Sequence, residues 1–168
     1  MTRTVKAAGL ALLVGLMGVG GQAAAAAQVT DRAAPAPERA IELQRQAEAL
    51  FSQPTQWRRA ARLLEASAEL RDEGDAGTYT CLVYAGRLRA AVGDHEGALR
   101  NLEAAAANAL ARGEVVEAAQ AYIDAAYAAV DARRADEAHD MAARAGLLAQ
   151  SRLISAEQRA AIIQRLGA

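Results

Sequence analysis

The sequence predicts an all-α fold in which antiparallel helical hairpins stack on one another. Its apolar content is mostly alanine, since 53% of the 168 residues are hydrophobic but only 4% are aromatic. Alanine is the strongest helix former, and the chain has only three prolines to interrupt helices. A spacing of roughly 40 residues, typical of stacked helical repeats, relates two trios of small residues. These trios are Ala47, Gly86 and Ala126, and Ala60, Ala98 and Ala138.

The N-terminal segment, residues 1–27, has the three-part pattern of a secretory signal peptide. Arg3 and Lys6 form a basic start, residues 7–21 are uncharged and largely apolar, and the alanines at 23–27 offer cleavage sites. The apolar stretch is shorter than the roughly 20 residues that a membrane-spanning helix needs. We therefore expect an exported protein, periplasmic or extracellular, with no integral membrane span after cleavage. An uncleaved anchor is the alternative.

Residues 28–37 are expected to form a flexible tether before an all-helical domain of residues 38–168. Pro35 and Pro37 favour extended backbone and delay the start of the first helix.

Apolar residues at helical spacing predict the first two helices at 38–52 and 56–71. Pro54 ends the first helix, and Thr55 is placed to cap the second. Residues 72–77 are acidic and contain two glycines, which indicates a loop.

The third and fourth helices are predicted at 78–92 and 95–112. Gly93 breaks the chain between them, and Asp94 is expected to cap the fourth helix.

Three more helices follow, at 114–132, 136–150 and 155–166. The corner at 133–135 has no glycine to mark it. Ser155 with Gln158 forms the pattern of a capping box, and Ile162, Ile163 and Leu166 are expected to be the buried face of the last helix.

Paired helices with small residues at fixed positions resemble the tetratricopeptide repeat (TPR) family over residues 38–150. The middle repeat carries the resemblance most fully, through a small residue late in its first helix, a Gly-Asp corner, and small and aliphatic residues in its second helix. These are Gly86, Gly93-Asp94, Ala98, Leu102 and Ala105. The resemblance implies a short TPR-like solenoid of about three hairpins, closed by a C-terminal capping helix. A closed, alanine-rich helical bundle is the alternative.

The resemblance also implies a concave surface lined by the first helix of each hairpin. Glu48, Arg87 and Tyr127 occupy equivalent positions and would form a row across it, with Val83 and Ile123 nearby. An acid, a guanidinium and an aromatic ring together suit a peptide or a partner helix. Alternatively, Tyr127 belongs to the core and the two charges are ordinary surface residues. The expected partner-binding residues are Gln44, Glu48, Arg87, Gln120, Tyr127 and Asp131.

No pattern typical of catalysis or of a cofactor site is present in the sequence. His95 and His139 lack the convergent ligands that zinc requires, and the lone Cys81 cannot form an intrachain disulfide. With a net charge of −1 and no polybasic stripe, the chain is not expected to bind nucleic acid. We therefore expect a protein that is not an enzyme and that needs no metal or cofactor.

These observations favour an exported, non-catalytic scaffold that binds a protein or peptide partner. One alternative is a small-molecule carrier with an apolar pocket between helices, lined by Leu82, Tyr84, Tyr122 and Ile123. A second is a structural protein that assembles with copies of itself, so the oligomeric state stays open.

Overall fold

The computed structural model describes residues 35–72 and 74–167, and this part of the chain is all-helical, as predicted. The predicted signal peptide and all but the last three residues of the predicted tether lie outside it. The described helices are α2 (Ala36–Glu48), the short 3₁₀ helix η1 (Pro54–Gln56), α3 (Trp57–Glu69), α4 (Ala76–Ala91), α5 (His95–Ala111), α6 (Val115–Asp131), α7 (Ala135–Ala149) and α8 (Ala156–Leu166).

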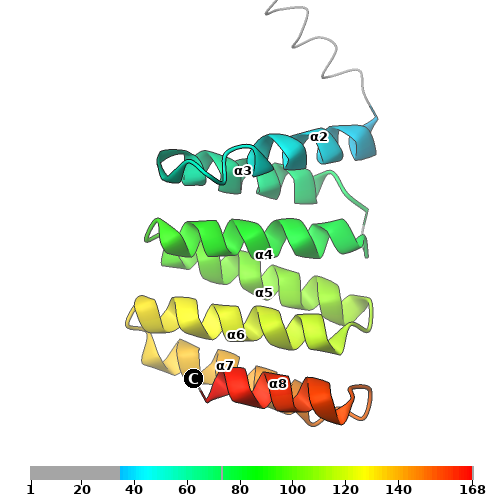
Figure 1. The fold of residues 1–168 in the computed structure, drawn as a ribbon, viewed down its shortest axis with the longest axis vertical. Helices are drawn as coiled ribbons and strands as arrows, with labels where there is room; N and C mark the ends of the chain where they lie inside the picture. The colour runs from blue at the N-terminus through cyan, green and yellow to red at the C-terminus, as the bar shows by residue number, and fades with distance from the viewer. Residues whose placement is uncertain (1–34, 73, 168) are drawn as a thin grey trace, which may run out of the picture. The chain divides into compact units, whose positions relative to one another are not determined.

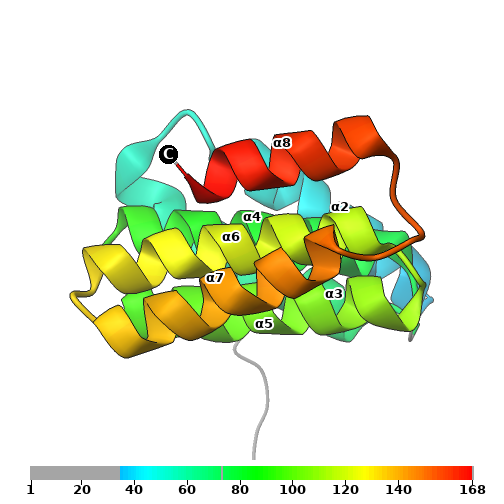
Figure 2. The same ribbon diagram turned by 90° about the horizontal axis from the view of Figure 1, so that it is seen from below.

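Each helix packs against the next helix along the chain, from α2 and α3 to α7 and α8. Helices α2, α4 and α6 lie on one side of this arrangement, and α3, α5 and α7 lie on the other (Figures 1 and 2). Helix α8 contacts both α7 and α6, and it packs on the layer formed by α2, α4 and α6. None of the helices at 35–72 and 74–167 is long and apolar enough to cross a membrane.

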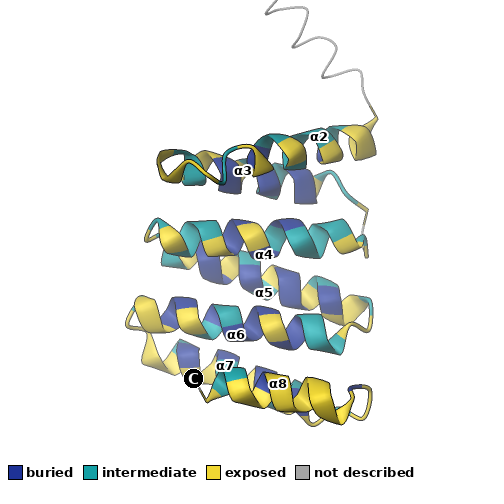
Figure 3. Cartoon of the chain, in the orientation of Figure 1, coloured by how far each residue is buried: buried dark blue, intermediate teal, exposed yellow. Residues whose placement is uncertain are grey.

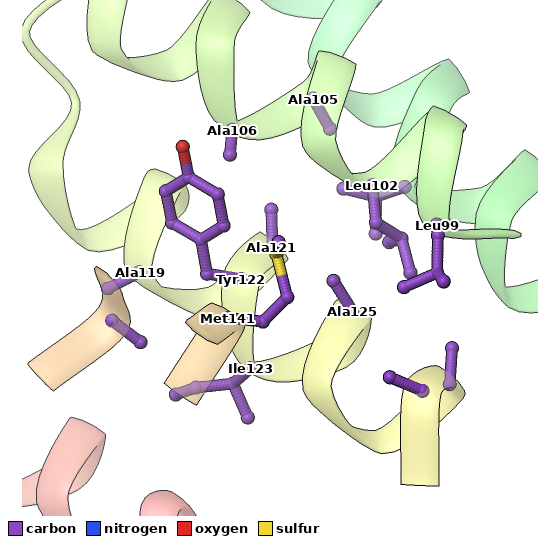
Figure 4. Packing of buried hydrophobic residues seen from close by; sticks show 14 of the residues in the cluster. Leu99, Leu102, Ala105, Ala106, Ala119, Ala121, Tyr122, Ile123, Ala125 and Met141 are labelled. Carbon is purple, nitrogen blue, oxygen red and sulfur yellow. The ribbon is translucent and has the colours of Figure 1, made fainter. Parts of the chain in front are cut away.

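The core consists of two clusters of mainly small residues that meet at α4. The larger cluster extends from α4 to α8, and Leu102, Tyr122, Ile123 and Met141 are among its larger members (Figure 4). The smaller cluster joins α2, α3 and α4, and Leu64 is its largest member. Because alanine buries little area, the helices must approach closely to exclude water. By contrast, α8 is mostly exposed (Figure 3).

Small residues bring α4 and α5 close together. A Cβ atom added to Gly86 would lie 2.7 Å from Cγ of Leu102 and 3.3 Å from the carbonyl oxygen of Ala98. The crossing therefore has no room for a larger residue at position 86. The third small residue of this trio, Ala126, is only half-buried.

Three corners have the same backbone geometry, after α4, α5 and α6. Gly93, Gly113 and Arg133 take positive φ angles of 78°, 76° and 58°. The amide that follows each of them donates to the carbonyl five positions back, at 2.8, 2.9 and 2.9 Å. This is a Schellman motif, and it ends all three helices in the same way. Arg133 adopts the left-handed conformation without being glycine, which explains why the sequence does not mark this corner.

The first helix differs from its predicted range of 38–52 at both ends. It begins at Ala36, because Pro37 fits the first turn, where no amide hydrogen bond is needed. It ends at Glu48, and the indole N–H of Trp57 donates to the carbonyl of Phe51 at 2.8 Å, which holds the following turn. The prediction that Thr55 caps the second helix is wrong, since Thr55 lies within η1.

The N-terminal caps of α5 and α8 agree with the sequence prediction, whereas that of α4 does not. Asp94 caps α5 as predicted, accepting from the amide of Gly97 at 3.0 Å. The capping box of Ser155 and Gln158 is also confirmed. Helix α4, however, begins two residues before its predicted start, because Asp75 accepts from the amide of Gly77 at 2.6 Å and caps it there.

The predicted buried face of the last helix is only partly correct. Ile162 is 2% exposed, but Ile163 is 56% exposed. Helix α8 packs along one narrow line, so only one residue of this adjacent pair can face the core.

Candidate functional site

Asp124 of α6 joins three helices on one surface of the protein. Its carboxylate accepts from Nη2 of Arg87 on α4 at 2.6 Å and from Nη2 of Arg165 on α8 at 2.7 Å. The Asp124 side chain is 11% exposed, whereas those of Arg87 and Arg165 are 51% and 40% exposed. Two half-exposed guanidiniums thus share one carboxylate, and each keeps further N–H donors at the surface.

Tyr127 lies beside this ion cluster, one helical turn after Asp124 on α6. Residues three positions apart share a face of a helix, so both side chains point to the same surface. The hydroxyl of Tyr127 donates to the backbone carbonyl of Arg165 at 2.5 Å, and the residue is 42% exposed. The expectation that Tyr127 lies on the surface is therefore correct, and the core alternative is wrong.

Aromatic side chains extend the surface from α4 toward the turn after α2. The guanidinium of Arg87 lies 5.9 Å from the ring centre of Tyr84, and this ring lies 5.7 Å from that of Phe51. Tyr84 is 44% exposed. We call these residues the α4–α6–α8 face: Phe51, Tyr84, Arg87, Asp124, Tyr127 and Arg165.

A small hollow of about 180 Å³ opens in this face between α4 and α6. Three of the six predicted binding residues line it: Arg87, Tyr127 and Asp131. The apolar side chain of Leu102 also lines it, together with Asp124. The hollow is smaller than typical small-molecule sites, whose volumes start at roughly 300 Å³. It can instead accept one anchoring side chain of a bound protein or peptide.

The other three predicted binding residues, Gln44, Glu48 and Gln120, do not line this hollow. Gln44 accepts from Nη2 of Arg71 at 2.7 Å and donates to Glu48 at 2.9 Å, so both polar groups are bonded within the protein. Gln120 is exposed on α6. The prediction that Val83 and Ile123 line a surface is wrong, because they are 5% and 1% exposed and belong to the core.

Sequence reasoning missed Asp124, Tyr84 and Arg165 as members of the site. A usable signal existed for Asp124, which lies three residues before Tyr127 on the same predicted helix. The role of Arg165 depends on where α8 packs, and no residue pattern in the last helix specifies its contact with α6.

Other reactive groups in the described part of the chain lie outside this face. No cluster of three or more His, Cys, Asp or Glu residues there is placed to hold a metal ion. Cys81 is buried, with its sulfur 3.5 Å from the Ser67 hydroxyl. Burial, with a smaller contribution from Glu117, raises the pKa of Tyr79 to about 12.

Comparison of the chain with family models, with curated proteins and with solved structures finds no match. The geometry of the α4–α6–α8 face is therefore the basis on which a function can be proposed.

Proposed function

We propose that this chain is an exported, non-catalytic scaffold that binds a protein or peptide partner through the α4–α6–α8 face. The observation that carries the proposal is the pair of half-exposed guanidiniums that share Asp124, next to the exposed ring of Tyr127 and a hollow for one side chain. Arginine and tyrosine are the residue types that contribute most to binding at protein interfaces. A partner segment with a carboxylate next to an apolar side chain fits this surface best.

The proposal includes a TPR-like architecture of stacked hairpins. The shared corner geometry at Gly93, Gly113 and Arg133 supports it, as does the close approach of α4 and α5 at Gly86. A scaffold of this kind presents side chains from several helices on one surface, as Arg87 and Asp124 are presented here.

Capture from an envelope extract tests the proposed binding face. The immobilised protein is compared with an Arg87→Glu, Tyr127→Ala double variant, which reverses one charge of the face and removes one of its exposed rings. The matched control is Arg62→Glu, Leu110→Ala, which reverses one charge and truncates one large apolar side chain at exposed positions on α3 and α5. Circular dichroism verifies that all three proteins are folded.

We expect one partner to bind the parent and the control but not the face variant, and its retention should weaken as salt rises from about 0.05 to 0.5 M. Retention of the same proteins by all three, or of none by any, contradicts the proposal.

Export is tested by sequencing the N-terminus of the protein recovered from its native host. The proposal expects a mature chain that begins shortly after the alanines at 23–27, recovered from the periplasm or the medium. Recovery from the cytoplasm with the segment 1–27 intact contradicts it.

A further inference from the structure

A second and larger hollow lies away from the α4–α6–α8 face, between α3 and α5. Its volume is about 390 Å³, within the usual range of small-molecule sites. Helix α4 contributes Leu82 to its lining, and α3 contributes Ala68, so part of the wall is apolar. Figure 2 shows α3 and α5 on the same side of the helical arrangement.

A hydrogen-bonded network closes part of this wall. Glu65 of α3 accepts from Nε and Nη2 of Arg89 at 2.5 and 2.7 Å, and from Asn101 of α5 at 2.6 Å. Burial disfavours the charged form of Glu65, but these hydrogen bonds outweigh it and hold the pKa of the carboxyl below its usual value. Glu65 and Arg89 are thus satisfied by the protein itself and act as a rigid boundary.

Two other polar groups of the lining keep hydrogen-bonding capacity for a ligand. Glu69 is exposed and makes no ion pair within the described part of the chain. Arg100 is 63% exposed and pairs only with Glu96, one turn away on its own helix. Exposed pairs of this kind are weak, so a ligand can compete for Arg100.

The lining carries both signs of charge in equal number. Glu65 and Glu69 contribute two carboxylates, and Arg89 and Arg100 contribute two guanidiniums. Such a balance gives no net attraction for a polyanion such as a nucleotide. It suits a ligand that carries one group of each sign.

We propose that this cavity binds a small zwitterion with an aliphatic side chain, namely a free amino acid or a dipeptide. Its ammonium group pairs with Glu69 and its carboxylate with Arg100. Its side chain packs on Leu82 and Ala68. The site is separate from the proposed partner-binding face and does not depend on it.

Titration calorimetry on the full chain tests the chemical class of the ligand. The probes are L-leucine and glycyl-L-leucine, and the controls are N-acetyl-L-leucine, which lacks the ammonium, and L-leucinamide, which lacks the carboxylate. We expect at least one zwitterion to bind with Kd below about 1 mM, and each control to bind about tenfold more weakly than L-leucine. Absence of binding in this range for both zwitterions, or equal binding of the controls, overturns the proposal.

Substitutions in the lining test the location. Glu69→Gln and Arg100→Gln should each weaken binding of the zwitterion about tenfold. The matched controls Glu157→Gln on α8 and Arg58→Gln on α3 remove exposed charges outside the cavity and should leave Kd unchanged. Binding that survives both lining substitutions, in proteins shown by circular dichroism to be folded, excludes this cavity.

Discussion

The pairs α4/α5 and α6/α7 have the same corner geometry but different residues at their corners. After α4, Gly93 supplies the positive φ angle, and Asp94 caps the next helix. After α6, Arg133 takes the positive φ angle, and Arg134 makes no side-chain cap. A left-handed conformation costs glycine little but costs other residues about 1 kcal/mol. Helix packing on either side of the corner must therefore hold Arg133 in place.

The two pairs also differ in how closely their helices approach. Gly86 on α4 leaves no room for a Cβ against Leu102, whereas its counterpart Ala126 on α6 is half-buried. Only the first pair has an ion cluster at its corner, where Arg89 bonds to both Glu65 and Asp94. The same backbone can thus be specified redundantly, as in α4/α5, or mainly by apolar packing, as in α6/α7.

The largest expected change in stability comes from placing leucine where the two helices of each pair cross, at position 86 in α4/α5 and at position 126 in α6/α7. Gly86→Leu should lower the free energy of unfolding by about 3 kcal/mol, because the new side chain meets Leu102 and the backbone of α5. Ala126→Leu, at a half-buried position, should cost less than about 1 kcal/mol. Urea denaturation followed by circular dichroism measures both. Equal losses would show that the two crossings are equally tight.

The next largest effect concerns the helix caps. Asp94→Ala should cost about 1–2 kcal/mol, because α5 loses its cap and Arg89 loses one partner. Arg134→Asn should instead add about 0.5–1 kcal/mol by providing α7 with the cap that it lacks. The same denaturation experiment compares them. A stability loss in Arg134→Asn would mean that its exposed pair with Glu137 matters more than a cap.

Exchanging the residue types at the corners should produce opposite and smaller changes. Arg133→Gly should stabilise the protein by about 0.5–1 kcal/mol, because glycine adopts the positive φ angle without strain. Gly93→Ala should destabilise it by about 1 kcal/mol for the reverse reason. Melting temperatures of the two variants would move in opposite directions. A shift in the same direction would contradict the steric explanation.

The smallest expected effect is a pH dependence of the stability that Asp94 contributes at the α4/α5 corner. The hydrogen bond from the Gly97 amide and the pairing with Arg89 hold the pKa of Asp94 below its ordinary value of 3.8. Its contribution to stability is therefore complete above that value and is lost as the pH falls through the lower, folded-state pKa. The destabilisation caused by Asp94→Asn should accordingly be smaller at about pH 2.5 than at pH 7, as measured by urea denaturation. A penalty that does not change with pH would contradict this assignment.

Most of the helices could be predicted from the sequence because the signals that define them are local. The Gly93-Asp94 corner and the capping box at Ser155 are examples, since each needs only residues within one turn. The start of α4 was misplaced because Asp75 lies in a loop with several acids, any of which could act as a cap. The turn after α2 is held by a hydrogen bond from Trp57, which begins α3 and is far from α2 in any local pattern.

The candidate site was less predictable because it depends on contacts between helices far apart in the sequence. Arg87 and Tyr127 could be placed on one surface because they occupy equivalent positions in a repeating pattern. Their connection through Asp124 and Arg165 requires α8 to lie next to α6. Val83 and Ile123 were misassigned because the pattern indicates which helix lines a surface but not which of its residues turn inward.

Site-specific photo-crosslinking tests the central claim, that the α4–α6–α8 face binds a partner, most directly. A photoreactive phenylalanine analogue replaces Tyr127 in one protein and Leu110, an exposed residue of α5, in a matched control. Both proteins are expressed in the native host and irradiated there. The proposal predicts one discrete crosslinked product from position 127, absent from position 110 and lost when Arg87→Glu is added. The same products from both positions, or none from position 127, would contradict it.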